Sequence, residues 1–189
     1  MVIADLKPLV EALLFVSDSP VRVERLAEVL ECDKAAVGQA VDALMADYGA
    51  GRGVMLHEVA EGYQFRTCPE SAEWIRRLAK SRPFRFSRAA LESLAIIAYR
   101  QPITRAEIEY LRGVDSGGVV KTLLDKHLVR ILGKKDVPGR PLMYGTSREF
   151  LEFFGLRDLG QLPALKEFSE LLPEHELQEH SVSNEQQEE

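Results

Sequence analysis

The 189-residue chain has few of the residues that build disulfide-rich domains or metal sites. It holds two cysteines, Cys32 and Cys68, and neither has a second Cys or a His at metal-ligand spacing. Two cysteines cannot form a disulfide framework, so we expect both to be buried thiols and expect no metal. The longest uninterrupted apolar run, Leu94–Tyr99, is six residues, whereas a membrane-spanning helix needs about twenty. The chain also starts without the basic segment of a secretory signal. These absences predict a cytoplasmic protein that lies in no membrane.

Charge is distributed unevenly along the chain. The formal net charge of −6 resides in residues 173–189, which carry six carboxylates and no Lys or Arg. A polar, acidic segment cannot bury a core, so we predict a disordered tail there. In the remainder, residues 1–68 carry six bases and eleven acids, a net −5, and residues 69–172 carry eighteen bases and thirteen acids, a net +5. The two halves therefore differ in electrostatic character.

Helical periodicity dominates the start of the chain. Apolar residues recur at helical spacing over Ile3–Ser17, over 23–30, and after Asp33, which we expect to cap a third helix. The helix over Ile3–Ser17 is apolar on nearly every side. A domain of under about seventy residues has too little interior to bury two opposite faces of a helix, so a partner surface is implied. Val54–Val59 and Tyr63–Thr67 then predict a hairpin.

A second unit repeats this order. It starts near Ser87, after a predicted amphipathic helix over 69–80 and a break at Pro83. Its first helix, 89–99, is almost wholly apolar, and its second begins with a capping box in Thr104–Glu107. Gly113 is predicted to end this second helix, and Asp115 or Ser116 to cap a third. Two strands, Val129–Leu132 and Leu142–Gly145, are predicted on either side of the loop Gly133–Pro141. A short helix, capped by Ser147 and ended by Gly155, completes the unit.

The two units are an internal repeat of architecture. A shift of 82 residues lays Pro20 on Pro102 and Val21 on Ile103. Two copies of three helices and a hairpin are typical of winged helix-turn-helix domains. We therefore predict a mainly α protein with small β-hairpins (α+β), built as two tandem winged helix-turn-helix domains plus a disordered acidic C-terminal tail. The predicted boundaries are 1–80 for the first domain with its trailing helix, 81–86 for a linker, 87–157 for the second domain, 158–172 for a short helical extension and 173–189 for the tail.

Motifs of catalysis are not found. His57-Glu58 lacks the second His of a zinc-binding HExxH helix, and we expect these residues on the outward side of a strand. Gly113–Gly118 has the glycine spacing of a phosphate loop, but two valines follow where Lys and Ser or Thr are required. The glycines are instead expected to let another group approach a helix start closely. We predict that the protein is not an enzyme and binds no cofactor.

Winged-helix domains most often bind DNA. Whether these domains can do so depends on the charge of the residues that would face the DNA phosphates. The predicted third helix of the first unit, 33–48, carries a net −2, and DNA phosphates would repel it. A basic stretch that could contact phosphate follows the first hairpin: Arg76, Arg77, Lys80, Arg82, Arg85 and Arg88. The same residues could simply keep a helix face solvated. A tandem winged-helix transcriptional regulator, using this stretch and the wing at 133–140, is the alternative function.

The second unit carries residue types enriched at protein interfaces. Tyr99–Arg105 places a Tyr and two Arg around a helix–helix corner. The wing Val137–Tyr144 contains two prolines, which fix the backbone and donate no hydrogen bonds. A rigid loop with Arg140 and Tyr144 suits an acidic, amphipathic partner segment. A loop that is merely stiff is the alternative interpretation.

Several of these segments closely resemble the ScpB family, segregation and condensation protein B. The motifs are Glu11–Phe15, Leu94–Ile108, Arg112–Val114, Lys135–Leu142, Tyr144–Thr146, Phe150-Leu151 and Phe154–Leu156. The resemblance runs from about residue 6 to residue 172. The chain departs from the family pattern at Ser116–Gly118, where we expect a more polar second position.

The resemblance implies a non-catalytic subunit of the bacterial SMC–kleisin complex, which supports chromosome condensation and segregation. It implies a homodimer formed through the first domain, the kleisin ScpA held mainly by the second, SMC reached only through ScpA, indirect or weak contact with DNA, and a nucleoid-associated place in the cytoplasm. The implied kleisin-binding residues are Tyr99, Arg100, Thr104, Arg105, Arg112, Lys135, Arg140 and Tyr144. The implied dimer-interface residues are Glu11, Leu13, Leu14 and Phe15.

Overall fold

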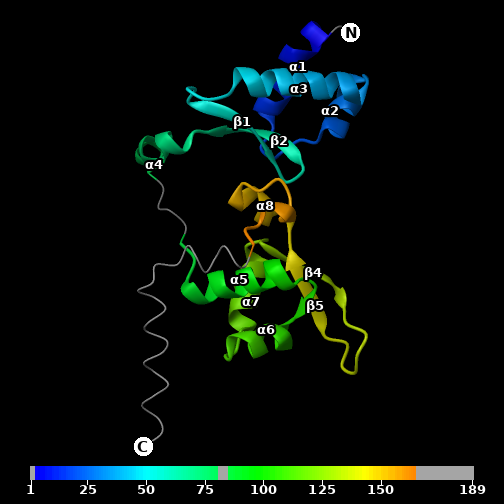
Figure 1. Cartoon of the computed structure of the whole chain (residues 1–189). Coiled ribbons are helices and arrows are strands. Elements are labelled where there is room, and N and C mark those ends of the chain that lie inside the picture. Colours follow the sequence, from blue (N-terminus) through cyan, green and yellow to red (C-terminus); the bar gives the residue numbers. More distant parts are fainter. Residues whose placement is uncertain (1–2, 81–84, 165–189) are drawn as a thin grey trace, which may run out of the picture. The chain divides into compact units, whose positions relative to one another are not determined.

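The structure, a computed structural model of the chain, describes residues 3–80 and 85–164 (Figure 1). It combines helices with two small antiparallel sheets, which confirms the predicted fold class at this level. The elements are α1 (Ile3–Val16), α2 (Val23–Leu30), α3 (Lys34–Asp47), β1 (Val54–Val59), β2 (Gly62–Thr67), η1 (Pro69–Ser71), α4 (Ala72–Ala79), α5 (Arg88–Arg100), β3 (Ile103–Thr104), α6 (Arg105–Arg112), α7 (Gly117–Asp125), β4 (Val129–Lys134), β5 (Leu142–Thr146), α8 (Arg148–Phe154) and η2 (Leu159–Gln161).

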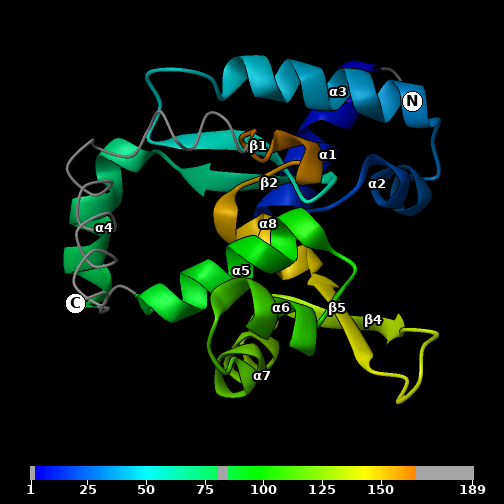
Figure 2. The ribbon, with the colours of Figure 1, turned by 60° about the horizontal axis from the view of Figure 1, so that its bottom comes forward.

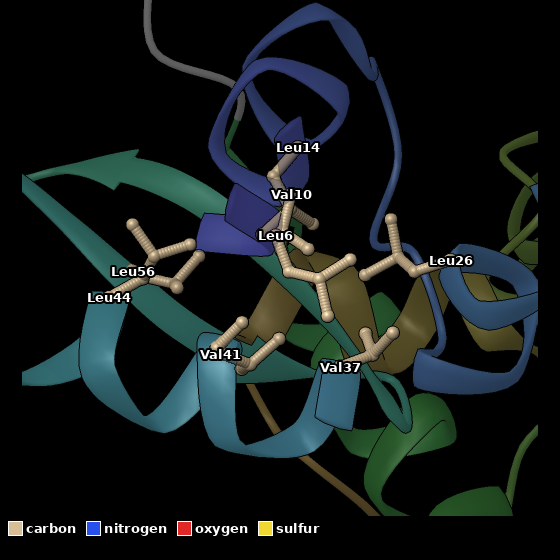
Figure 3. Packing of buried hydrophobic residues seen from close by; sticks show 9 residues of the cluster. Leu6, Val10, Leu14, Leu26, Val37, Val41, Leu44 and Leu56 are labelled. Carbon is tan, nitrogen blue, oxygen red and sulfur yellow. The ribbon is translucent and has the colours of Figure 1, made fainter. Parts of the chain in front are cut away.

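The first group consists of α1, α2, α3 and the hairpin β1–β2, with α1 packed against α3 (Figure 1). Leu6, Val10 and Leu14 recur every four residues on α1, so they form one stripe, and all three are buried. They pack with residues of α3 and β1, including Val41 and Leu44, in a single apolar cluster (Figure 3). The core of this group therefore lies between one face of α1, the inner face of α3 and the hairpin.

The other side of α1 is not buried within the chain. Leu9 is 44% exposed, Phe15 82% and Val16 74%. The sequence pattern predicted a helix that is apolar on nearly every side and needs a partner surface, and the described part of this chain covers one face only.

The two cysteines differ in burial. Cys32 departs from the expectation of a buried thiol, since it is half-buried, whereas Cys68 is buried as expected.

The second group consists of α5, α6, α7 and the sheet ordered β3-β5-β4, which Figure 2 shows gathered beside one another. The Ser87 hydroxyl accepts a hydrogen bond from the Ala90 N–H and caps α5, as the sequence predicted. Gly113, at φ +70°, ends α6 in the left-handed region that glycine adopts without strain. Strand β4 continues to Lys134, past the predicted end at Leu132, with an irregularity in register between Ile131 and Gly133. The loop after it is correspondingly shorter than predicted.

Strand β3 was not predicted, and it reveals how the repeat is built. Ile103 pairs with Tyr144 of β5, and in the first group Val21 forms an isolated bridge with Tyr63 of β2. Val21 exchanges two backbone hydrogen bonds with Tyr63, of 2.9 and 2.8 Å. Each group therefore pairs the residue after its first helix and proline with the second strand of its hairpin. The match of Val21 with Ile103 in the sequence corresponds to this shared pairing.

Two predicted caps differ in detail. Asp33 precedes α3 as its N-cap residue, but its side chain accepts no hydrogen bond from the helix start. Ser116, not Asp115, is the N-cap residue of α7, and its side chain likewise makes no capping bond. The predicted helix over 69–80 begins with the short η1 turn and continues as α4. Residues 81–84 of the predicted linker, most of the predicted extension over 158–172 and the predicted tail lie outside the described residues.

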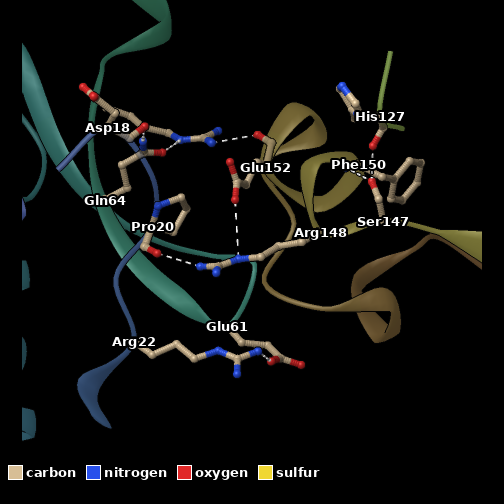
Figure 4. A network of polar contacts seen from close by, with 11 residues as sticks. Asp18, Pro20, Arg22, Glu61, Gln64, His127, Ser147, Arg148, Phe150 and Glu152 are labelled. Carbon is tan, nitrogen blue, oxygen red and sulfur yellow. Dashed lines mark hydrogen bonds and ion pairs between the residues drawn. The ribbon is translucent and has the colours of Figure 1, made fainter. Parts of the chain in front are cut away.

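Backbone hydrogen bonds join the turn of the first hairpin to the segment after α8. Ala60 N–H donates to the Leu156 carbonyl and Glu61 N–H to the Arg157 carbonyl, both at 2.9 Å. Arg148 donates to the Pro20 carbonyl at 2.6 Å, within the polar network in Figure 4. Helix α8 and the segment after it are thereby hydrogen-bonded to the first group.

Removal of a core side chain tests this packing. Leu44 is fully buried between α3, α1 and β1, so Leu44→Ala is expected to lower the free energy of unfolding by about 2–5 kcal/mol. Val29→Ala on the exposed side of α2 should change it by less than about 0.5 kcal/mol. Urea denaturation of the three proteins measures both values. Equal effects of the two substitutions would contradict the position of the core.

Candidate protein-binding surfaces

The described residues hold no arrangement typical of metal chemistry. Across 3–80 and 85–164, no group of three or more His, Cys, Asp and Glu side chains lies close enough together to hold a metal ion. In the same residues, no helix has the length and apolar character needed to cross a membrane. A cavity of about 600 Å³ lies where α8 meets the first hairpin, and several of its charged lining residues make structural contacts. Arg22 pairs with Glu61 there, and Arg148 holds the Pro20 carbonyl (Figure 4).

The first candidate surface is the exposed side of α1. A cavity of about 400 Å³ opens between this helix and the end of the hairpin. Its lining is mostly apolar or aromatic: Pro8, Glu11, Ala12, Phe15, Tyr48, Val54 and Phe65. An apolar hollow beside an exposed Phe is typical of a surface that another molecule covers.

The four residues predicted for the dimer interface have different environments. Phe15 projects from the surface, whereas Leu14 is buried in the core of its own chain and Leu13 packs partly against that core. Glu11 accepts a hydrogen bond from the Tyr48 hydroxyl, which raises the pKa of Tyr48. Phe15 and Glu11 therefore offer side chains at the surface, and Leu14 supports the helix from inside.

The second candidate surface lies at the corner between α5 and α6. A groove of about 290 Å³ is lined there by Arg100, Pro102, Ile103, Glu107, Tyr110 and Leu111. Tyr110 is 86% exposed and Leu111 is also exposed. The corner thus presents an aromatic ring, an aliphatic side chain and an Arg, the combination found at the centres of protein interfaces.

Three residues predicted to bind the kleisin are turned inward by the fold. Thr104 is buried, and it forms the predicted capping box because its hydroxyl accepts from the Glu107 N–H while the Glu107 carboxylate accepts from the Thr104 N–H. Tyr144 is buried in β5. The Arg112 side chain is buried as well, and it donates to Ser116 at 2.8 Å and pairs with Glu92 at 3.3 Å. These side chains hold the corner together.

The other five predicted residues lie at or near the surface around this corner. Arg100 is exposed beside the groove, and Tyr99 is half-buried. Arg105 is exposed on α6, where it pairs with Glu109 at 3.3 Å, and its guanidinium lies near Gly117 at the start of α7. Arg140 is exposed in the wing at φ +40°. The fifth residue, Lys135, connects the wing to the corner.

Lys135 is joined to the capping box by an ion pair. Its ammonium lies 2.5 Å from the Glu107 carboxylate. This contact, followed by the hydrogen bonds from the Thr104 backbone and hydroxyl, lowers the pKa of Glu107 from 4.5 to about 2. The base of the wing is therefore held against the start of α6.

Tyr110 and Leu111 were not among the predicted site residues, although the sequence held a signal for Tyr110. Ile108 is the buried residue of α6, and a residue two positions further along a helix lies on a different face. Tyr110 occupies that position, so helical geometry turns it away from the core. Its exposure could have been derived once Ile108 was assigned to the core.

The basic stretch is exposed but partly paired. Arg76 and Arg77 are exposed on α4, Lys80 is exposed at its C-cap, and Arg77 pairs with Glu73. Arg88 pairs with Glu92 at 3.4 Å on α5, and Arg85 is exposed. Arg82 lies outside the described residues.

Comparisons with known proteins identify relatives of this chain. A family model described as segregation and condensation complex subunit ScpB matches residues 8–165. Segregation and condensation protein B of Syntrophotalea carbinolica is 67% identical over 173 residues, which are 91% of this chain and 88% of that protein. The protein of the same name from Myxococcus xanthus is 50% identical over 171 residues, 90% of this chain and 52% of that protein. A crystal structure of a dimer of an ScpB N-terminal domain complexed with ScpA peptide is 28% identical, covers 40% of this chain and 96% of that chain, and has a TM-score of 0.37.

The matched class is that of subunits of the segregation and condensation complex. Within this class, the chain belongs to the ScpB family. The match confirms the resemblance carried by the sequence motifs, and it extends over both groups of helices and strands.

The low pKa of Glu107 makes the corner sensitive to acid. A carboxylate whose pKa is lowered by folding stabilises the fold above its unfolded-state pKa, and the contribution is lost as the pH falls through the folded-state value. The stability difference between the wild type and Glu107→Gln should therefore stay constant above about pH 5 and shrink between about pH 4.5 and pH 2. Urea denaturation of both proteins over this range measures it. Parallel pH profiles of the two proteins would show that Glu107 does not hold the wing.

Proposed function

We propose that this chain is a non-catalytic subunit of an SMC–kleisin complex, with two tandem winged-helix domains that form a homodimer through the first and bind the kleisin ScpA through the second. Membership of the ScpB family supports the place in the complex. The order of three helices and a hairpin, repeated in both groups, supports the domain assignment. Binding of ScpA rests on one observation above all, the groove at the α5–α6 corner.

The dimer is supported by the apolar side of α1. Phe15 and Val16 are among the most exposed apolar residues of the first group. Full burial of a Phe side chain stabilises an assembly by about 1.5–3 kcal/mol. A second copy presents the same surface, so a twofold axis beside α1 would cover both sets of side chains at once.

Kleisin binding is supported by the chemistry of the corner. Tyr110 and Leu111 provide contact area, and Arg100 provides a cation at the rim of the same groove. Residues 69–172 carry a net +5, which favours an acidic partner segment. The wing with Arg140 is attached beside this groove through Lys135 and Glu107. An amphipathic, acidic stretch of ScpA matches this surface, because its apolar side chains fit the contact area and its carboxylates fit the positive charge.

Direct binding of DNA is less well supported than binding of the kleisin. The third helix of the first group, α3, uses Val37, Val41 and Leu44 for the core and carries Asp42 and Asp47. Phosphate-driven DNA binding would weaken log-linearly as salt rises. We expect the purified protein to show no such steep slope in the absence of ScpA.

Dimerisation can be tested at Phe15. Phe15→Asp places two carboxylates near the twofold axis, so it should convert the dimer to a monomer at micromolar concentration. Phe15 is exposed in the single chain, and the folded monomer should keep its helical circular dichroism. Light scattering after size exclusion measures the mass. A dimer of unchanged stability would show that α1 is not the interface.

Kleisin binding can be tested at the corner. Arg100→Glu and Tyr110→Ala should each weaken binding of the central segment of ScpA at least tenfold, which is about 1.4 kcal/mol, because central Arg and aromatic residues dominate interface energies. Dimer mass should not change. Arg25→Glu, an exposed Arg on α2, is the matched control. Isothermal titration calorimetry measures the affinity.

Two results would contradict this assignment. If Arg100→Glu and Tyr110→Ala both bound ScpA with wild-type affinity, the groove would be excluded as the ScpA-binding site. Loss of ScpA binding in Phe15→Asp alone would place the kleisin on the first domain or make binding dependent on the dimer.

A further inference from the structure

Helix α4 presents apolar side chains to solvent. Against the part of the chain that the structure describes, none of its eight residues is buried. Trp74 is 66% exposed and Leu78 is 86% exposed. The two are four positions apart and therefore share one face of the helix. The Arg77 guanidinium lies 4.8 Å from the centre of the Trp74 ring, which adds a cation to the same surface.

The cavity beside α1 has the complementary character. Its volume of about 400 Å³ falls in the range of pockets that enclose drug-sized groups. Phe15, Val54 and Phe65 provide apolar walls, and Glu11 is the charged member of the lining. An aromatic side chain that carries a cation at its edge matches both the walls and this carboxylate.

Both surfaces lie at the same end of the first hairpin. Val54, in the cavity lining, pairs with Thr67, the last residue of β2. The chain then passes Cys68, whose N–H donates to the Gly53 carbonyl at 3.1 Å, and enters η1 and α4. Figure 1 shows α4 extending beyond this end of the hairpin. No residue of α4 is part of the lining, so the cavity is not filled by the Trp74 of its own chain.

We propose that in the homodimer Trp74 of each copy inserts into the α1 cavity of the other copy. This inference rests on the proposed dimer, and the inserted Trp74 is the contact that stabilises it. Each copy carries one inserted side chain and one cavity, as a self-complementary twofold interface requires. The same insertion covers Phe15, which lines the cavity, and brings Arg77 of one copy close to Glu11 of the other.

Charge favours this exchange. Residues 1–68, which build the cavity, carry a net −5, whereas α4 carries Arg76 and Arg77 against Glu73. Opposite charges therefore face each other across the proposed contact, and this fixes its orientation.

Trp74 is the single tryptophan of the chain, so its fluorescence reports on this contact alone. The full-length protein should show blue-shifted emission at micromolar concentration, and the emission should move to longer wavelength on dilution with the same midpoint as the loss of dimer mass in light scattering. Phe15→Asp should show the long-wavelength emission at every concentration. A dimer by light scattering whose Trp74 emission equals that of Phe15→Asp would overturn the inference and leave the dimer standing. A monomer at all concentrations would overturn both.

Variants provide an independent test. Trp74→Ala should raise the dimer dissociation constant at least tenfold, and Trp74→Phe should have a smaller effect because an aromatic ring remains. Val29→Ala, an exposed apolar residue on α2 away from the cavity lining, is the matched control and should leave dimerisation unchanged. Since α4 buries none of its residues in the described chain, both Trp74 variants should unfold thermally like the wild type when all are diluted to monomers. Wild-type dimerisation of Trp74→Ala would exclude insertion.

Discussion

Helix α1 has more apolar surface than its own domain can bury, and this constraint governs the rest of the molecule. One stripe, with Leu6 and Val10, forms the core with α3 and the hairpin. The opposite side, with Phe15 and Val16, remains exposed. A single layer of helices on one face cannot cover a helix that is apolar all round. We propose that a second copy covers this side.

The second group uses the same architecture under a different constraint. Its first helix, α5, buries Leu94 and Ile97 within the group, and its polar residues fix a corner. The capping box and the Lys135–Glu107 pair hold the start of α6 to the base of the wing. The outward residues of that corner, Arg100 and Tyr110, are then presented on a rigid frame, which limits the entropy lost on binding. We therefore propose that the first repeat serves self-association and that the second binds a polypeptide of opposite charge.

Local signals in the sequence were sufficient for most of the elements. Ser87, Thr104 with Glu107, and Gly113 predicted helix ends correctly, because caps depend on residues that are close in the chain. Strand β3 was missed, since two residues have no periodicity and are defined only by their pairing with β5.

The candidate site was harder to predict than the fold. Arg112 and Tyr144 have the residue types of interface centres, but tertiary packing turns them inward, and residue type alone does not show direction. Trp74 was overlooked because an amphipathic pattern predicts a helix without showing whether anything covers its apolar face.

The central claim, that the exposed side of α1 is covered by a second copy, can be tested most directly by hydroxyl-radical footprinting of Phe15. Its oxidation rate in the full-length wild-type protein at micromolar concentration should be several-fold lower than in the same protein diluted below the dimer midpoint. Tyr110, equally open in the single chain, should react at the same rate in both samples. Equal oxidation of Phe15 at the two concentrations would contradict the account.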